Sequence, residues 1–301
     1  HLMHTAKQQP PPHELPEAYV PLITAMQQHK GAYPTMGNEL RLLESGADFI
    51  IALLRAIRAA RHHIHVESYI FEDDPVGRLV RDALTDSARR SVEVRVIYDD
   101  VGCWRVPQRF FDEMTQNGIQ AEAFLPVRLP SLTSKVNYRN HRKICIIDGV
   151  EGFIGGMNIA QRYVSRRKGQ WTDLQLHIKG AAVGALQRTF LTDWHIVTEA
   201  LITERSYFPD NQGMHRGGLM QIIDATPVSQ YPEIEFGLVW VSMHAKRYLY
   251  LQTPYFMPTE PMLNALKVAA LAGTDVRIMV PQKPDAFWLR LANDSYFSDL
   301  L

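Results

Sequence analysis

The 301-residue sequence predicts an α/β protein in which helices pack on both faces of a mixed sheet, as an α-β-α sandwich. The first observation behind this prediction is a regular alternation of helix-like and strand-like segments between residues 47 and 198. The second is that the same order of segments starts again after residue 218, which indicates a duplicated domain. The third is the composition, because 46% hydrophobic and 21% charged residues supply a sizeable core.

The N-terminal segment, residues 1–37, is polar and contains Pro10-Pro11-Pro12, so it is predicted to be a tether. Its first three residues resemble a cloning remnant and are left out of the fold prediction. No run of about 20 apolar residues occurs, so no membrane-spanning helix is expected. We expect the chain to be a soluble fragment of a longer protein.

The first domain is predicted over residues 38–203. Its first helix, 47–61, places Ile50, Leu54 and Ile57 on one face. The elements that follow are a strand over 64–71, a helix over 76–90, a strand over 92–98, a helix over 107–117 that Gly118 ends, strands over 119–124, 143–147, 152–154 and 174–178, and a helix over 181–198. The two strands around residue 150 are expected to pair across an Asp148-Gly149 turn.

A polar segment over 204–218 is predicted to link this domain to a second one, 219–301. After a helix over 233–245, residues 248–256 repeat the pattern of residues 63–71. The equivalent of His141 would fall past residue 301, so the second copy is expected to be incomplete.

The most informative stretch is a histidine and a lysine two residues apart, His141 and Lys143, followed by Asp148. The period of a strand places His141 and Lys143 on one side of the sheet. An imidazole can attack a phosphodiester there to give a phosphohistidine, while the cation holds the non-bridging oxygens. Asp148, beside the turn, is expected to be a structural or ion-pairing residue, although it belongs to the candidate catalytic set.

A Gly-Gly-x-Asn turn follows the motif strand. Gly155 and Gly156 are candidates for binding the substrate phosphate, and Asn158 is predicted to add an amide donor and the positive end of a helix. No cofactor or metal is expected, since lysine and asparagine side chains supply the electrostatic stabilisation.

This pattern resembles the H-x-K-x4-D motif of the phospholipase D superfamily, and its surroundings resemble bacterial cardiolipin synthases. The resemblance also rests on residues 67–71, 137–143, 185–188 and 252–256. It implies a phospholipase D-like sandwich with two motif copies, of which this chain shows one. The family orients its histidine with an acidic residue about thirty positions downstream, which here implies Asp173.

The implied reaction is transfer of a phosphatidyl group from one phosphatidylglycerol to the hydroxyl of another, with release of glycerol. His141 would be the nucleophile, or the acid/base for a second histidine; we favour the nucleophile. The implied partners are anionic phospholipid and the membrane surface, at the bacterial cytoplasmic membrane. Glu67 and Gln252 occupy equivalent repeat positions and are candidates to support the histidines or bind substrate.

Two other functions stay open: a phospholipase D-type hydrolase or nuclease, and an inactive lipid-binding module. Nucleic acid is not expected as a partner, because 32 basic residues balance 32 acidic ones.

Several other residues have a bland interpretation that we prefer. Cys145 is expected in the core, His62, His63 and His65 in a structural role rather than at a metal, and the His244-Ala245-Lys246 sequence at a helix end. The basic run of Arg162, Arg166, Arg167 and Lys168 is either a solvated loop or a lipid contact, and Trp104 is a candidate to enter lipid.

Overall fold

The computed structural model describes residues 15–126, 139–164, 171–211, 217–226, 228–282 and 296. Its chain forms two compact units. The first contains residues 32–222, and the second combines residues 16–31 with the chain from 223 onward. Among the described residues, no helix is both long and apolar enough to cross a membrane.

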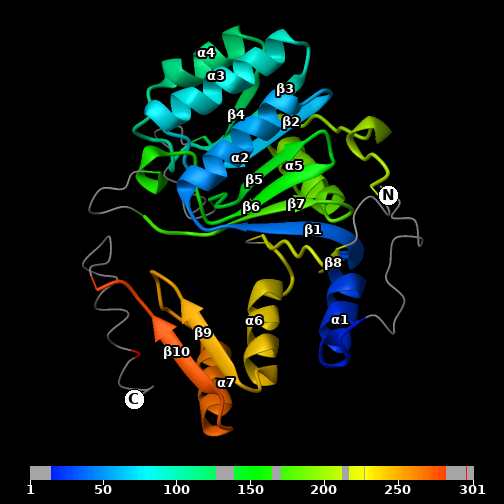
Figure 1. Ribbon diagram of the computed structural model, residues 1–301, viewed down its shortest axis with the longest axis vertical. Coiled ribbons are helices and arrows are strands. Elements are labelled where there is room, and N and C mark those ends of the chain that lie inside the picture. Colours follow the sequence, from blue (N-terminus) through cyan, green and yellow to red (C-terminus); the bar gives the residue numbers. More distant parts are fainter. Residues whose placement is uncertain are drawn as a thin grey trace. The chain divides into compact units, whose positions relative to one another are not determined.

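The first unit is built on an eight-stranded sheet with the order β4-β3-β2-β5-β6-β7-β1-β8 (Figure 1). β2, β3 and β4 are parallel, whereas the pairs from β2–β5 through β1–β8 are antiparallel, so the predicted mixed sheet is confirmed. The strands are β1 Thr35–Leu43, β2 His63–Ser68, β3 Glu93–Asp99, β4 Gln120–Phe124, β5 Lys143–Ile147, β6 Glu151–Gly155, β7 Gln175–Lys179 and β8 Gly218–Met220.

Helices cover both faces of this sheet, which confirms the predicted α-β-α layers. α2 (Gly46–Ala59), α3 (Pro75–Arg89) and α4 (Gln108–Gln116) share one apolar cluster with the sheet, and α5 (Val183–Thr198) shares another. Short 3-10 helices lie at Glu17–Tyr19, Gln161–Tyr163 and Arg205–Tyr207.

The central strand β5 is buried along its whole length. Cys145 and Ile147 belong to the cluster of α2, α3 and α4, whereas Ile144 and Ile146 belong to the cluster of α5. Burial on both faces explains why this strand is a continuous apolar run rather than an alternating one. The predicted pairing with β6 is present, with Ile147 opposite Glu151.

The second unit contains α1 (Val20–Lys30), α6 (Glu233–His244), α7 (Glu260–Leu271) and the parallel pair of β9 (Tyr248–Gln252) and β10 (Asp275–Met279). α1 corrects the prediction that residues 1–37 are a tether throughout. Ile23 and Met26 are buried at helical spacing, and Gly31 ends the helix with φ of 63°.

The boundary between the units also differs from the predicted linker at 204–218. Tyr207 is buried against the first unit, the Asn211 side chain donates to the carbonyl of Gly149, and β8 pairs with β1. The first unit therefore extends to residue 222 and begins with β1, whose first residues we had assigned to the tether.

Candidate active site

The motif residues meet at one edge of the large sheet, because five strand ends converge there. The end of β2 lies beside the start of β5, with Ser68 opposite Lys143. The end of β6 lies beside the start of β7, with Gly155 opposite Gln175. The C-terminal end of β3, parallel to β2, lies at the same edge.

His141 and Lys143 lie together at this edge, as the strand period predicts. His141 is exposed, and its ring centre lies 4.6 Å from that of Tyr69. Lys143 is only 5% exposed; its Nζ lies 5.3 Å from the centre of the Tyr69 ring and donates to the carbonyl oxygen of His141 over 2.6 Å. Tyr69 was not predicted as a site residue. Its position follows from the pairing of β2 with β5.

Burial changes the acid–base properties of both groups. It lowers the pKa of His141, and the charge of Lys143 lowers it further while Asp173 opposes both. Burial also lowers the pKa of Lys143 to about 8. At neutral pH the imidazole is therefore uncharged and able to act as a nucleophile, and the lysine still carries a proton.

Asp173 reaches this edge because two glycines leave room for it. A Cβ on Gly156 would lie 2.1 Å from Asp173 Oδ1, and one on Gly155 would lie 2.4 Å from the carbonyl oxygen of Leu174. The amide of Gly156 donates to that same carbonyl. The glycine pair thus fits the close approach of the chain before β7, and the Gly156 N–H is not directed at a phosphate.

Asn158 lies at the same edge but is fully engaged by the protein. Its Oδ1 accepts from the amide of Ile70 over 2.9 Å, and its Nδ2 donates to the hydroxyl of Tyr163 over 2.7 Å. In this arrangement Asn158 fastens the chain after β6 to the chain after β2, whereas the sequence predicted an amide donor for the substrate.

Asp148 lies at the other end of β5, roughly 16 Å away along the strand. Its carboxylate accepts from the backbone amides of Arg61, His62 and His63 at 2.7–2.9 Å. It cannot touch a phosphodiester at His141, and these contacts give it the structural role that we expected.

A buried polar network lies beneath the motif. Glu67 is 2% exposed, and the side chain of Asn140 contacts both Glu67 and Asp193. Arg142 Nη1 lies 2.5 Å from Asp193 Oδ2. Burial and the charge of Asp193 raise the pKa of Glu67 well above its usual range. Asp193 escaped the sequence prediction because it stands in the middle of α5, where no local pattern links it to the motif.

Gln252, paired with Glu67 by the sequence repeat, lies in the second unit. It is the last residue of β9 and is exposed there. Its predicted role in substrate binding stays a prediction.

The histidines at the start of β2 form a separate buried cluster, at the opposite edge from His141. Gln187 bridges His63 Nε2 and His65 Nδ1, at 3.1 and 2.7 Å. Within the described part of the chain no three metal-ligating side chains come together. His244 stacks on Trp240 at the end of α6. Arg166, Arg167 and Lys168 lie outside the described residues.

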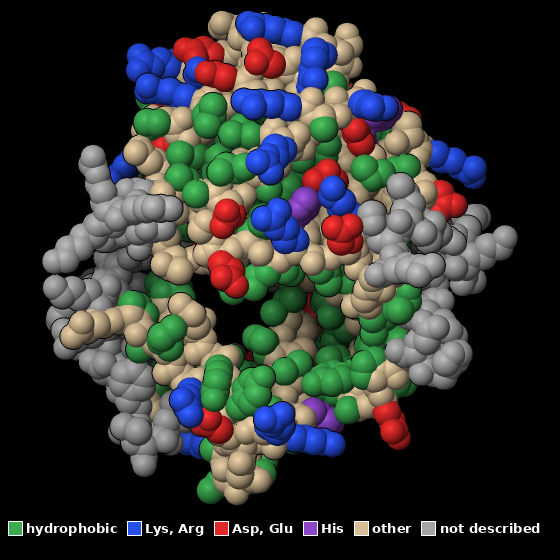
Figure 2. Space-filling model, viewed as in Figure 1, with side chains coloured by type: hydrophobic (Ala, Val, Ile, Leu, Met, Phe, Trp, Pro, Cys, Tyr) green, Lys and Arg blue, Asp and Glu red, His purple; other side chains and the backbone are tan. Residues whose placement is uncertain are grey.

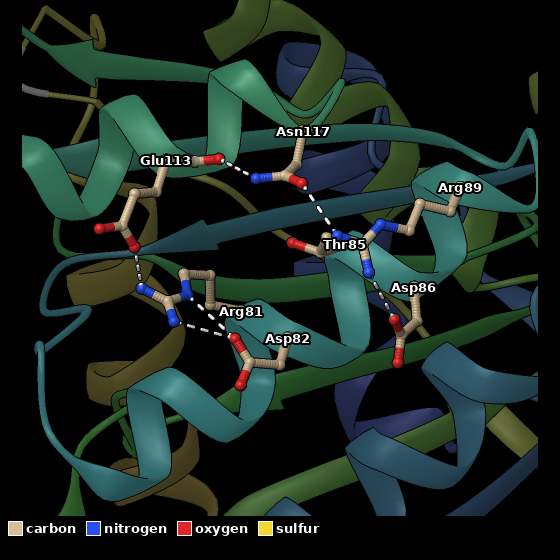
Figure 3. A pocket seen from close by; sticks show the side chains of 7 residues that line it. All are labelled: Arg81, Asp82, Thr85, Asp86, Arg89, Glu113 and Asn117. Atoms are coloured by element: carbon tan, nitrogen blue, oxygen red, sulfur yellow. Dashed lines mark hydrogen bonds and ion pairs between the residues drawn. The ribbon is translucent and has the colours of Figure 1, made fainter.

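A shallow groove between α3 and α4 is lined by charged side chains (Figure 3). Arg81 pairs with Glu113 and Asp82, and Arg89 pairs with Asp86. Because these charges neutralise one another and none belongs to the motif edge, we assign no ligand to the groove.

The comparisons with known proteins point to the same residues. The family described as "Cardiolipin synthase, PLD-like domain" matches residues 53–194, which include β5 and Asp173. The chain is 39% identical over 270 residues to a cardiolipin synthase of Alkalihalophilus pseudofirmus, covering 89% of this chain and 54% of that protein. It is 37% identical over 284 residues to the major cardiolipin synthase ClsA of Bacillus subtilis, covering 93% and 59%. The chain thus spans little more than half the length of these relatives.

Among solved structures, phosphatidylserine synthase of Haemophilus influenzae is similar with a TM-score of 0.62 at 17% identity. The match covers 93% of this chain and 72% of that one, and it shows a shared fold. Together with the sequence matches, it places this chain in the phospholipase D-like family of cardiolipin synthases.

Proposed function

We propose that the chain supplies the first catalytic half of a cardiolipin synthase, which transfers a phosphatidyl group between two phosphatidylglycerol molecules. The observation that carries this proposal is the meeting of His141, Lys143 and Asp173 at one sheet edge, in a chain about 40% identical to cardiolipin synthases. Because those relatives are almost twice as long, we propose that activity needs a protein of their length, with a second motif.

In the proposed first step, the neutral His141 ring attacks phosphorus. A P–N bond forms, the P–O bond to the glycerol headgroup breaks, and an acid in the second motif protonates the leaving oxygen. Lys143 stabilises the charge that grows on the non-bridging oxygens. Asp173 favours the positive charge that the ring acquires.

In the second step, the terminal hydroxyl of another phosphatidylglycerol attacks the phosphohistidine. The new P–O bond forms as the P–N bond breaks, and the hydroxyl proton passes to the group that acted as acid before. His141 is regenerated, so the cycle consumes no cofactor or metal.

We also propose that the motif edge faces the bacterial cytoplasmic membrane. Trp104 follows β3 and is 73% exposed, and the Arg105 guanidinium lies 5.1 Å from its ring centre. Trp171 precedes β7 and has Arg162 over its ring at 5.2 Å. Tryptophan suits the membrane–water interface and arginine suits anionic headgroups, so these pairs support lipid contact on both sides of His141.

The test is to incubate the full-length protein with phosphatidylglycerol vesicles and to measure lipids and free glycerol by mass spectrometry. Cardiolipin and glycerol in equal amounts, both lost in His141→Ala, are expected. Phosphatidic acid as the main product would instead assign a hydrolase, an alternative that the exposure of His141 to water favours. Neither product would refute both functions.

A further inference from the structure

Two carboxyl groups are buried together under the motif, which is costly if both are charged. Glu67 and Asp193 are each about 2% exposed. Glu67 stands on β2, opposite Ile144 of the motif strand, and Asp193 stands on α5. Like charges at this depth repel strongly, so a pair of carboxylates is stable only when a cation or a proton compensates it.

One cation is present, and it compensates one charge. Arg142 forms an ion pair with Asp193. Asn140 donates its amide to Glu67 Oε1 and Asp193 Oδ2. The other Glu67 oxygen, Oε2, is buried and meets no hydrogen-bond donor among the described residues. A proton on Glu67 would satisfy that oxygen through Asp193 and would make the group of Glu67, Asp193 and Arg142 neutral.

This group holds the residues on either side of His141. Asn140 and Arg142 are its chain neighbours, and both end on Asp193. The Asn140 Oδ1 also accepts from the backbone amide of Arg142 over 3.0 Å, closing a turn around His141. His141 itself is exposed and makes no contact with the carboxyl pair that would fix it directly. Its backbone is therefore fixed through its two neighbours.

We propose that Glu67 and Asp193 share one proton and act as positioning residues, which hold the His141 segment through Asn140 and Arg142. This inference rests on the proposed function, because it assigns a role within the same reaction. It replaces the expectation that Glu67 binds substrate, since Asn140 lies between Glu67 and the motif histidine. The raised pKa of Glu67, caused by burial and by Asp193, agrees with it.

The proton can be observed without turnover. In D2O at pH 7, the infrared difference spectrum of this chain minus its Glu67→Gln variant should show the C=O band of a protonated carboxylic acid. Ser87→Ala is the control, because Ser87 is buried and hydrogen-bonded on α3, away from the motif. That variant should leave the band in place. Carboxylate bands alone in the Glu67→Gln difference spectrum would contradict the shared proton, whether or not the full-length protein makes cardiolipin.

The kinetic test uses three variants of the full-length protein. Glu67→Gln keeps the shape of a protonated carboxyl and an N–H donor for Asp193, so it should retain kcat within about threefold. Glu67→Ala should lose about 10- to 100-fold in kcat with little change in KM, as removal of an outer supporting group does at other sites. Ser87→Ala should keep full activity. Equal losses in Glu67→Gln and Glu67→Ala would contradict the proposal.

The pH profile separates positioning from charge. An ionised Glu67 would raise the pKa of Lys143. If Glu67 carries the proton, Glu67→Gln changes no charge, and the alkaline limb of kcat/KM stays where it is in the wild type. A shift of that limb to lower pH in Glu67→Gln would show that Glu67 was charged and would overturn the inference.

Discussion

Lys143 is a charged side chain in a nearly closed environment, and this determines how the site should respond to pH. Burial lowers its pKa to about 8, and burial lowers the pKa of His141 below its ordinary 6.5. We predict that kcat/KM rises with pH as His141 loses its proton and falls through about pH 8 as Lys143 loses its own. A pH series of initial rates on phosphatidylglycerol vesicles measures both limbs.

Lys143→Arg is the matched variant, because a guanidinium stays charged throughout this range. Its rate is expected to fall, since the planar group fits differently, but its alkaline limb should move well above pH 8. An alkaline limb that stays near pH 8 in Lys143→Arg would assign that titration to another group.

Gly156 controls the approach of Asp173. A methyl group there would overlap Asp173 Oδ1, at 2.1 Å, so Gly156→Ala should displace the carboxylate. We predict a loss of about 10- to 100-fold in kcat, because an outer partner of the nucleophile is lost. Gly184→Ala is the control: it lies in α5 with open space around it and should keep full activity. Wild-type kcat in Gly156→Ala would exclude a role for Asp173.

At the scale of residues, the sequence predicted what lies close along the chain. His141, Lys143 and Asp173 were found because a motif and a downstream acid are recognisable by spacing. Tyr69 and Asp193 became visible only with the strand order, because β2 and α5 approach the motif from distant parts of the sequence. Asn158 was placed correctly at the edge, but its partners depend on the neighbouring loop.

The hairpin of β5 and β6 is fastened to the start of β2 by Asp148. Its carboxylate accepts three backbone amides, and its φ of 53° is one that glycine and asparagine tolerate. We predict that Asp148→Gly, which relieves the backbone but removes the carboxylate, lowers the free energy of unfolding by about 2–3 kcal/mol. Asp148→Asn keeps one acceptor and should lose less. Urea unfolding curves measure both, and equal stability of Asp148→Gly and wild type would contradict the assignment.

The histidine cluster on β2 should make the first unit sensitive to acid. Burial lowers the pKa of His63 to about 4. Since the unfolded chain binds this proton near pH 6.5, stability is complete above that pH and is lost as pH falls towards about 4. His63 should contribute about 3 kcal/mol to the loss.

Thermal melts between pH 7 and pH 4 test this. His63→Gln should flatten the dependence of Tm on pH, whereas His195→Gln, at an exposed position on α5, should not. An unchanged slope in His63→Gln would mean that His63 does not titrate on unfolding.

At the scale of elements, prediction failed where composition misled. α1 was hidden because prolines precede it and its polar residues dominate the segment, although Ile23 and Met26 carry a helical spacing. β1 and β8 were missed because they pair at the far end of the sheet from the motif, where no sequence signal connects residues about 180 apart.

For the whole molecule, the fold class was predictable and the division into units was not. The second unit takes α1 from the start of the chain, which no local pattern reveals. In the first unit β2 has a strand on each side, whereas among the described residues β9 pairs only with β10. Large apolar side chains are exposed on α6 and β9, among them Phe236, Leu238 and Tyr250, and apolar groups gather on this unit in Figure 2.

The charge of the molecule is evenly mixed. Basic and acidic side chains alternate over the face of the first unit that Figure 2 shows, in line with a formal net charge of zero. Such a surface gives no broad attraction to nucleic acid. Any affinity for anionic lipid must therefore be local, as proposed for the two tryptophan–arginine pairs.

The most direct test of the central claim is to trap the covalent intermediate on the full-length protein. Phosphatidylglycerol labelled with 32P is mixed with the enzyme, quenched with alkali within milliseconds, and the labelled peptide is sequenced. We predict label on the peptide that contains His141, and none in His141→Asn. Label on a histidine elsewhere, with His141→Asn still labelled, would show that His141 is not the nucleophile.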